Sequence, residues 1–163
     1  MRLLIKRSIG DWRIILSVGR VTGVQGVNST LTDGNHMLMW EFDTTAYAPV
    51  YLALAQAQRR YTLPEIRILQ SHPDGGFHAY CWTRMPFIRT VTIVSSTPGV
   101  DPGFITMCCA RRHWTLRLTD KGQGTPKLMS VVKSLLPDES DISDLVGGVH
   151  YTTHRAKQTF GLS

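Results

Sequence analysis

The segment that most restricts the fold is a hydrophobic run at residues 36–43, His-Met-Leu-Met-Trp-Glu-Phe-Asp, which ends in two acids. Such a run is typical of a largely buried strand. Because side chains alternate across a strand, Glu41 and Asp43 are expected on one face, and Trp40 and Phe42 on the other. The Cα atoms of the two acids then lie roughly 6.5–7 Å apart, so both carboxylates can reach one cation. The alternative is a strand that simply emerges into water.

The segments before and after this strand predict an α+β domain. Apolar residues at helical spacing, with Thr44 or Thr45 as a cap, predict a helix over residues 45–61. Strands are expected at 2–6, 12–18, 66–70, 77–83 and 114–118, a helix at 126–136, turns or a loop at 19–35, and a short apolar segment at 103–110. Residues 86–96 favour a helix that starts at a proline, although the β-branched run at 90–94 also suits a strand. This order favours a mixed or antiparallel sheet that contains one hairpin and has helices on one face.

The length and composition are those of one globular domain. We expect a single domain over residues 1–163, with a tail from about residue 138 that is harder to place. The 42% hydrophobic content supports a sizeable core, in which Cys81, Cys108 and Cys109 are expected as small buried residues. No apolar run reaches the roughly 18 residues of a membrane span, and the charged start lacks a signal peptide's apolar stretch. The expected location is the cytoplasm, or wherever the host keeps its DNA.

The positive charge of the chain indicates the class of partner. The net charge is +6 and the isoelectric point is near 9.5. A basic surface favours polyanions such as nucleic acid. Several acids nevertheless stand in segments that otherwise look buried, and acids in such places call for metal ions or basic partners.

A second group of candidate residues lies in the turn of the expected hairpin. Ser71 begins the turn, and Gly75 and Gly76 allow the backbone to approach a ligand closely or to form a tight hairpin. Amides of such a turn can hold a phosphate, and His78 in the next strand can donate to a triphosphate oxygen or bind a metal. A lone histidine in a strand is often structural, so that alternative stays open.

A third group lies further along the chain. Asp101 stands between a valine and a proline, where an aspartate of a turn is the plain alternative to a ligand. Arg117 lies in the apolar strand 114–118 between two leucines, which indicates an anionic ligand or a carboxylate partner. Lys121 and Lys127 add positive charge near the same edge.

Together and in this order, the three groups resemble the motifs of the archaeo-eukaryotic primase superfamily. That family has a hydrophobic strand ending in an acid pair, a second motif ending in histidine, and a third motif of a hydrophobic residue followed by Asp. The matching segments here are 37–43 with Glu41 and Asp43, 76–78 with His78, and 100–101 with Asp101. The strand 114–118 looks like the family's basic strand near the nucleotide phosphates. The resemblance covers residues 36–121, and it departs from the commoner pattern in having Glu as the first acid.

The resemblance implies a minimal catalytic core with an RRM-like sheet and flanking helices, which makes or extends primers on a DNA template. The implied metal ligands, for two Mg²⁺ or Mn²⁺ ions, are Glu41, Asp43 and Asp101. The residues implied to bind the incoming nucleotide are Ser71, Gly75, Gly76, His78, Arg117 and Lys121. The implied partners are a single-stranded DNA template, ribo- or deoxyribonucleoside triphosphates and a replicative helicase, in a viral or mobile replication system without a membrane.

Three other interpretations remain open. An RNA-recognition module has a similar strand order, and Tyr80 and Trp82 supply aromatic side chains, although its basic-aromatic signature is not matched. A rolling-circle nicking endonuclease also uses a small sheet and a metal, but the expected pair of histidines one residue apart is missing from the sequence. A catalytically inactive primase-like scaffold is compatible with the same residues.

Overall fold

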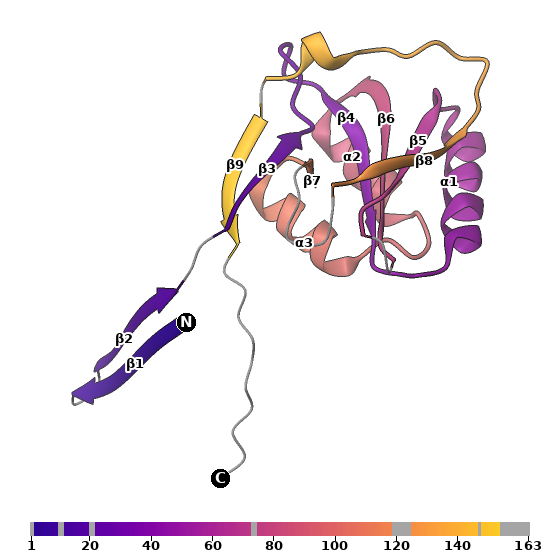
Figure 1. Cartoon of the computed structure of the whole chain (residues 1–163). Helices are drawn as coiled ribbons and strands as arrows, with labels where there is room; N and C mark the ends of the chain where they lie inside the picture. The colour runs from indigo at the N-terminus through magenta and orange to yellow at the C-terminus, as the bar shows by residue number, and fades with distance from the viewer. Residues whose placement is uncertain are drawn as a thin grey trace.

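The computed structural model describes residues 2–9, 12–19, 22–72, 75–118, 125–146 and 148–153, with side chains described from residue 26 to residue 146 within these ranges. This part of the chain contains an antiparallel sheet of four strands in the order β4-β6-β5-β8 (Figure 1). The strands are β4 (His36–Phe42), β5 (Ile66–Gln70), β6 (Phe77–Met85) and β8 (Lys127–Val132). The helices are α1 (Tyr47–Tyr61), α2 (Phe87–Ser95) and α3 (Pro102–Arg111).

The predicted α+β class is confirmed, and its large sheet is antiparallel. The strand at 36–43, the helix at 45–61, the hairpin of 66–83 and the helix at 86–96 all occur, with ends that differ by a few residues. The predicted threonine cap of α1 is wrong. The N-cap is Ala46, which makes no side-chain cap bond, while Thr44 Oγ1 accepts a hydrogen bond from the Ala46 amide at 3.2 Å.

Strand β4 is fixed in the sheet by the aromatic residues on its helix-facing side. Trp40 and Phe42 are 0% and 1% exposed. The Trp40 indole Nε1 donates to Thr97 Oγ1 at 3.1 Å, just beyond the end of α2. This contact satisfies the one polar group of a buried indole. Glu41, between the two aromatics in sequence, therefore points to the sheet face away from the helices.

A second sheet and a separate hairpin complete the described strands. The order of the second sheet is β7-β3-β9, built from β3 (Thr22–Asn28), β7 (Thr115–Arg117) and β9 (Gly148–Thr153). Strands β1 (Arg2–Ile9) and β2 (Trp12–Gly19) pair only with each other among the described strands, and Figure 1 shows their hairpin extending away from the four-stranded sheet. A short 3-10 helix, η1 (Ile142–Asp144), precedes β9. None of the described helices has the length and apolar content needed to cross a bilayer.

Two predicted elements are corrected by long-range pairing, and one segment without a predicted type is a helix. Residues 22–28, predicted as loop, form β3 because strands from much later in the chain pair with both of its edges. Residues 127–132, predicted as helix, form the edge strand β8 because their backbone pairs with β5. The apolar segment at 103–110 is the helix α3, which begins with Asp101 as N-cap and Pro102 in its first turn.

The cysteines do not all lie in the core. Cys81 and Cys108 are buried, but Cys109 is exposed because neighbouring residues of a helix point about 100° apart. Burial raises the pKa of the Cys108 thiol to about 11, so this side chain is a neutral thiol at neutral pH. The prediction of three core cysteines is therefore wrong for Cys109.

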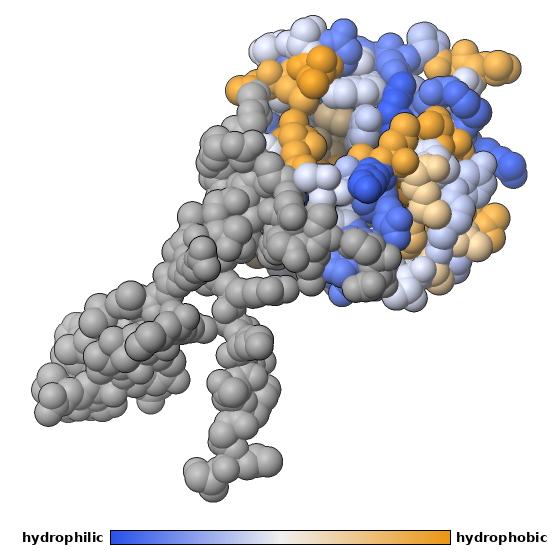
Figure 2. All heavy atoms as spheres, viewed as in Figure 1, coloured by the Kyte–Doolittle hydropathy of each residue, from blue (hydrophilic) through white to orange (hydrophobic). Residues whose placement is uncertain are grey.

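Hydrophobic residues also reach the surface on the sheet side of the molecule. Figure 2 shows them over β8 and near η1, and the exposed apolar side chains there include Leu128, Met129 and Ile142. Scattered exposed apolar residues are normal on a small domain.

Candidate functional site

The candidate site is centred on Glu41 and His78, which are directly opposite each other on neighbouring strands β4 and β6. His78 Nε2 lies 3.7 Å from Glu41 Oε1. The imidazole is buried, with 4% of its side chain exposed, whereas 43% of the Glu41 side chain is exposed. The pair therefore joins a buried ring to a carboxylate that is open to solvent, on the sheet face away from the helices.

The turn between β5 and β6 packs against the end of β4. The Gly76 amide donates to the Thr44 carbonyl at 2.7 Å, and the Ser71 amide donates to the Gly76 carbonyl at 3.0 Å. Gly75 and Gly76 have φ values of 136° and 80°, which L side chains rarely adopt. A Cβ at Gly75 would meet the Thr45 methyl at 2.7 Å. Gly75 is thus required by the close approach of the turn to residues 44–45, whereas a Cβ at Gly76 would meet Ser71 Oγ at 2.8 Å.

The amides of this turn have partners within the protein. Gly75 donates to the His72 carbonyl at 3.2 Å, in addition to the Gly76 bond to Thr44. A phosphate held by the two glycine amides has to displace both bonds. Asp43 is exposed beside the turn, and it lines a shallow open hollow with Thr44, Thr45, His72, Gly75 and Gly76.

Asp101 has a clear structural role at the same end of the sheet. Its amide donates to the Glu41 carbonyl at 2.9 Å, which ties the start of α3 to the end of β4. Its two carboxylate oxygens accept from the amides of Gly103 and Phe104, each at 3.0 Å. Asp101 is therefore the N-cap of α3. Asp followed by Pro is a helix-start signal that could have predicted this role from the sequence.

Arg117 reaches the turn from strand β7. Its Nη2 donates to the Ser71 carbonyl at 2.8 Å. Arg117 and His78 also border one cavity of about 200 Å³ on the sheet face. The rest of its lining is mainly apolar and aromatic and includes Met37, Met39, Tyr80, Trp82 and Leu116. Nothing in the sequence indicates that these residues share a cavity, because β3, β7 and η1 bring parts of its wall from distant positions.

The structure brings most of the predicted residues to one end of the sheet. Glu41 is the cross-strand partner of His78, Asp101 is bonded to Glu41, and Arg117 is bonded to Ser71. Lys121 lies outside the described residues.

The predicted metal ligands are near one another but are not assembled around one point. Carboxylate oxygens are the donors that Mg²⁺ and Mn²⁺ prefer, so the residue types fit such ions. Among the described residues, however, no three His, Cys, Asp or Glu side chains are placed so that they could hold a metal ion together. Metal binding by Glu41, Asp43 and Asp101 therefore requires their side chains to turn toward a common point.

Comparisons with known proteins add no family to these observations. No protein-family model matches the chain, and neither a curated protein nor a solved structure matches it.

Proposed function

We propose that the chain is a DNA-templated nucleotidyltransferase of the archaeo-eukaryotic primase type, which makes or extends primers. The observation that carries the proposal is the meeting of Glu41, His78, Asp101 and Arg117 at one end of a sheet. These four residues come from the four segments on which the resemblance in the sequence rests.

The topology supports an RRM-like core. The elements β4, α1, β5, β6 and α2 follow one another in the order strand–helix–strand–strand–helix, and the strands lie in the order β4-β6-β5. This is the arrangement of the first three strands in split βαβ folds, where the first and third strands are neighbours. Glu41 and His78 lie on those two neighbouring strands.

The residues have distinct proposed roles. Glu41, Asp43 and Asp101 hold Mg²⁺ or Mn²⁺, and two such ions, when bound, stabilise the attacking and leaving oxygens of nucleotidyl transfer. His78 and Arg117 hold the triphosphate by charge-assisted hydrogen bonds. The buried position of His78 and the partly buried position of Arg117 strengthen such bonds, because less water competes for them.

The proposal is tested by nucleotide incorporation. Purified protein is given a single-stranded DNA template, with and without a primer, labelled ribo- or deoxyribonucleotides, and Mg²⁺ or Mn²⁺. We expect extended products that Glu41→Gln and Asp43→Asn abolish. Glu65→Gln is the matched control, because Glu65 pairs with Lys133 and lies next to Ile66, at the opposite end of β5 from the site. Failure to incorporate under every condition would contradict the proposal.

A second candidate function is binding of single-stranded nucleic acid without catalysis. It is favoured by Tyr80 and Trp82, whose rings meet edge to face at 5.6 Å on the sheet face that carries the site. Aromatic residues on a sheet face stack on bases in RNA-recognition modules. Binding that is lost in Tyr80→Ala, by a protein that incorporates no nucleotide, would favour this function over the first.

A further inference from the structure

The helical layer of the protein has an unusual charge distribution. The helices α1, α2 and α3 contain no Asp or Glu, and their charged residues are Arg59, Arg60, Arg89 and Arg111. Two arginines on the described sheet strands are paired with acids: Arg84 bonds to Asp33 and Asp144, and Arg67 to Asp138. Within the described part of the chain, no carboxylate pairs with any of the helix arginines.

Three of these arginines line two hollows. These three arginines, together with Tyr61 and Thr92, form what we term the α1–α2 basic surface. Arg59 and Arg60 line the first hollow, and Arg89, Tyr61 and Thr92 line the second. The Arg60 guanidinium lies 5.4 Å from the Tyr61 ring centre, and Tyr61 and Ser96 share a hydroxyl hydrogen bond of 2.8 Å that joins the two helices.

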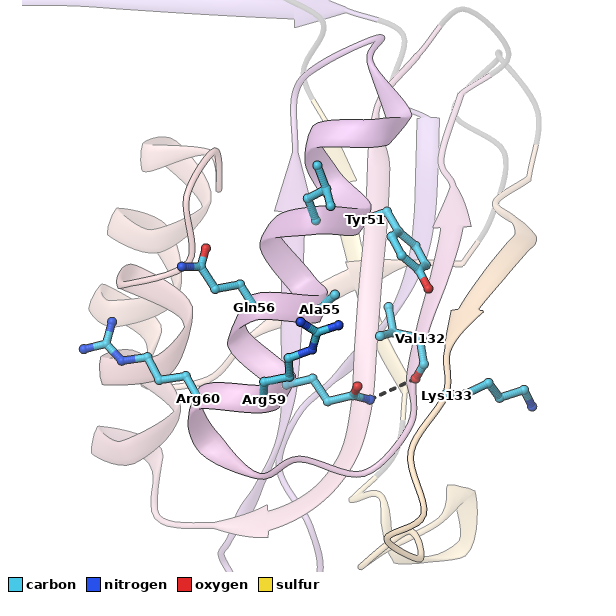
Figure 3. Close-up of a pocket in the computed structure, with 9 residues that line it drawn as sticks. Tyr51, Ala55, Gln56, Arg59, Arg60, Val132 and Lys133 are labelled. Atoms are coloured by element: carbon cyan, nitrogen blue, oxygen red, sulfur yellow. Dashed lines mark hydrogen bonds between the residues drawn. The ribbon is translucent and has the colours of Figure 1, made fainter.

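Figure 3 shows how the first hollow is arranged. Gln56 and Arg60 extend from one side of α1, whereas Tyr51 lies on the side of β8. Gln58 fixes the helix against the sheet, because its Nε2 donates to the Val132 carbonyl at 2.9 Å. Arg59, Arg60 and Arg89 are all exposed. The guanidinium groups therefore project into solvent from helices that are packed against the rest of the domain.

Helix electrostatics explains only part of this arrangement. Arg59 and Arg60 lie in the last turn of α1, where a cation interacts favourably with the helix dipole. Arg89 is the third residue of α2, in its first turn, where a cation is unfavourable. No acid in that turn compensates for it. An external anion bound at this place would compensate for it and would also pair with the two arginines of α1.

We propose that the α1–α2 basic surface binds the phosphate backbone of single-stranded DNA, outside the candidate active site. Unpaired guanidinium groups next to an aromatic ring and hydroxyl groups are the elements of a sequence-independent single-strand groove. Glu41 points away from the helices, so this surface lies across the sheet from the site. It holds a segment of the single strand that lies outside the active site and is not being copied. The choice of DNA as the anion rests on the proposed function.

Anisotropy of a fluorescein-labelled oligothymidylate tests the proposal; about 20 nucleotides cover a typical single-strand site. Arg89→Ala should weaken binding about three- to tenfold at low salt and lower the salt slope by about 0.7. Arg59→Ala with Arg60→Ala should weaken it further. Arg111→Ala is the matched control, because it removes one exposed helix arginine outside both hollows. Equal losses in Arg89→Ala and Arg111→Ala would show a net-charge effect and overturn the proposal.

Two further measurements separate this proposal from the proposed function. Glu41→Gln should stop nucleotide incorporation and leave oligothymidylate binding unchanged. The wild-type chain could fail to incorporate nucleotides while Arg89→Ala still weakens oligothymidylate binding. In that case the basic surface stands and the enzymatic proposal falls. If incorporation occurs and Arg89→Ala binds as tightly as wild type, the surface proposal falls alone. If a polyglutamate peptide competes for binding as strongly as unlabelled DNA does, the surface binds an acidic protein partner, and this result would also overturn the surface proposal.

Discussion

The variants Asp101→Asn and Asp101→Ala can separate the structural role of Asp101 as a helix cap from its proposed role as a metal ligand. The carboxylate caps α3 with two hydrogen bonds of 3.0 Å, to the amides of Gly103 and Phe104. It is also a proposed metal ligand. Asn is as good an N-cap as Asp but is a neutral and much weaker ligand, whereas Ala removes both functions.

The expected stability effects follow from the cap. Replacing an Asp N-cap with Ala costs typically about 1 kcal/mol of unfolding free energy. For a chain of this length, that loss lowers Tm by about 2–4 °C. Asp101→Asn keeps one acceptor oxygen for the cap, and loses the second hydrogen bond and the attraction between the charge and the helix dipole, which is about 0.3–1 kcal/mol at an exposed helix start. Because Asn is as favourable as Asp at an N-cap, Asp101→Asn should still melt nearer to wild type than Asp101→Ala does.

The assay combines thermal melting with nucleotide incorporation on the same two proteins. We expect neither variant to incorporate nucleotides, and only Asp101→Ala to show the full fall in Tm. Near-normal incorporation by Asp101→Asn would refute the role of this carboxylate in metal binding. An equal fall in Tm for both variants would refute the side-chain cap as the source of the stability effect.

Three further outcomes are expected. His78→Ala and Arg117→Ala should lower kcat/KM for the nucleotide about ten- to hundredfold, because a charge-assisted hydrogen bond contributes roughly 1.5–3 kcal/mol; a loss of DNA affinity instead would place both residues on the wrong ligand. Thr97→Val leaves the buried Trp40 indole without its acceptor, and should cost about 1–3 kcal/mol in denaturant unfolding, whereas Thr97→Ser should cost less. Burial lowers the pKa of His36, so the unfolded chain binds more protons and the unfolding free energy should fall as the pH drops below about 6.5; an equal fall in His36→Gln would assign the effect to other groups.

The sequence predicted those elements whose signal is local. The strand at 36–43 is marked by a hydrophobic run, the helix at 45–61 by apolar residues at helical spacing, and the hairpin by the glycine-rich turn. Strands β3 and β8 were missed because their stability comes from partners distant in the chain. Thr22 pairs with Thr153, and Lys127 pairs with Gln70. Nothing local in either segment identifies those partners.

For the candidate site, the residues could be selected from the sequence but their surroundings could not. The sequence suggested that Glu41, His78 and Asp101 act together, and the structure places them at one end of the sheet. It did not suggest that Asp101 caps a helix or that the amides of Gly75 and Gly76 already have partners. The cap is a local contact of the Asp101 side chain, and the Asp-Pro pair is a signal that could have predicted it. The bond from the Gly76 amide to the Thr44 carbonyl is a tertiary contact between backbone atoms, which all residue types share, so the sequence does not identify it.

The position of Glu41 and the stability of the core depend on the same strand register. Trp40 and Phe42 are buried on the helix-facing side of β4, so Glu41 must point to the other face. A slip of one residue would bury a carboxylate beside the helices and turn both aromatics away from their pocket. Burial of the two rings stabilises the domain by several kcal/mol, at about 25 cal/mol for each Å² removed from water. The hydrophobic core therefore holds Glu41 opposite His78 even though the two side chains contribute little to stability themselves.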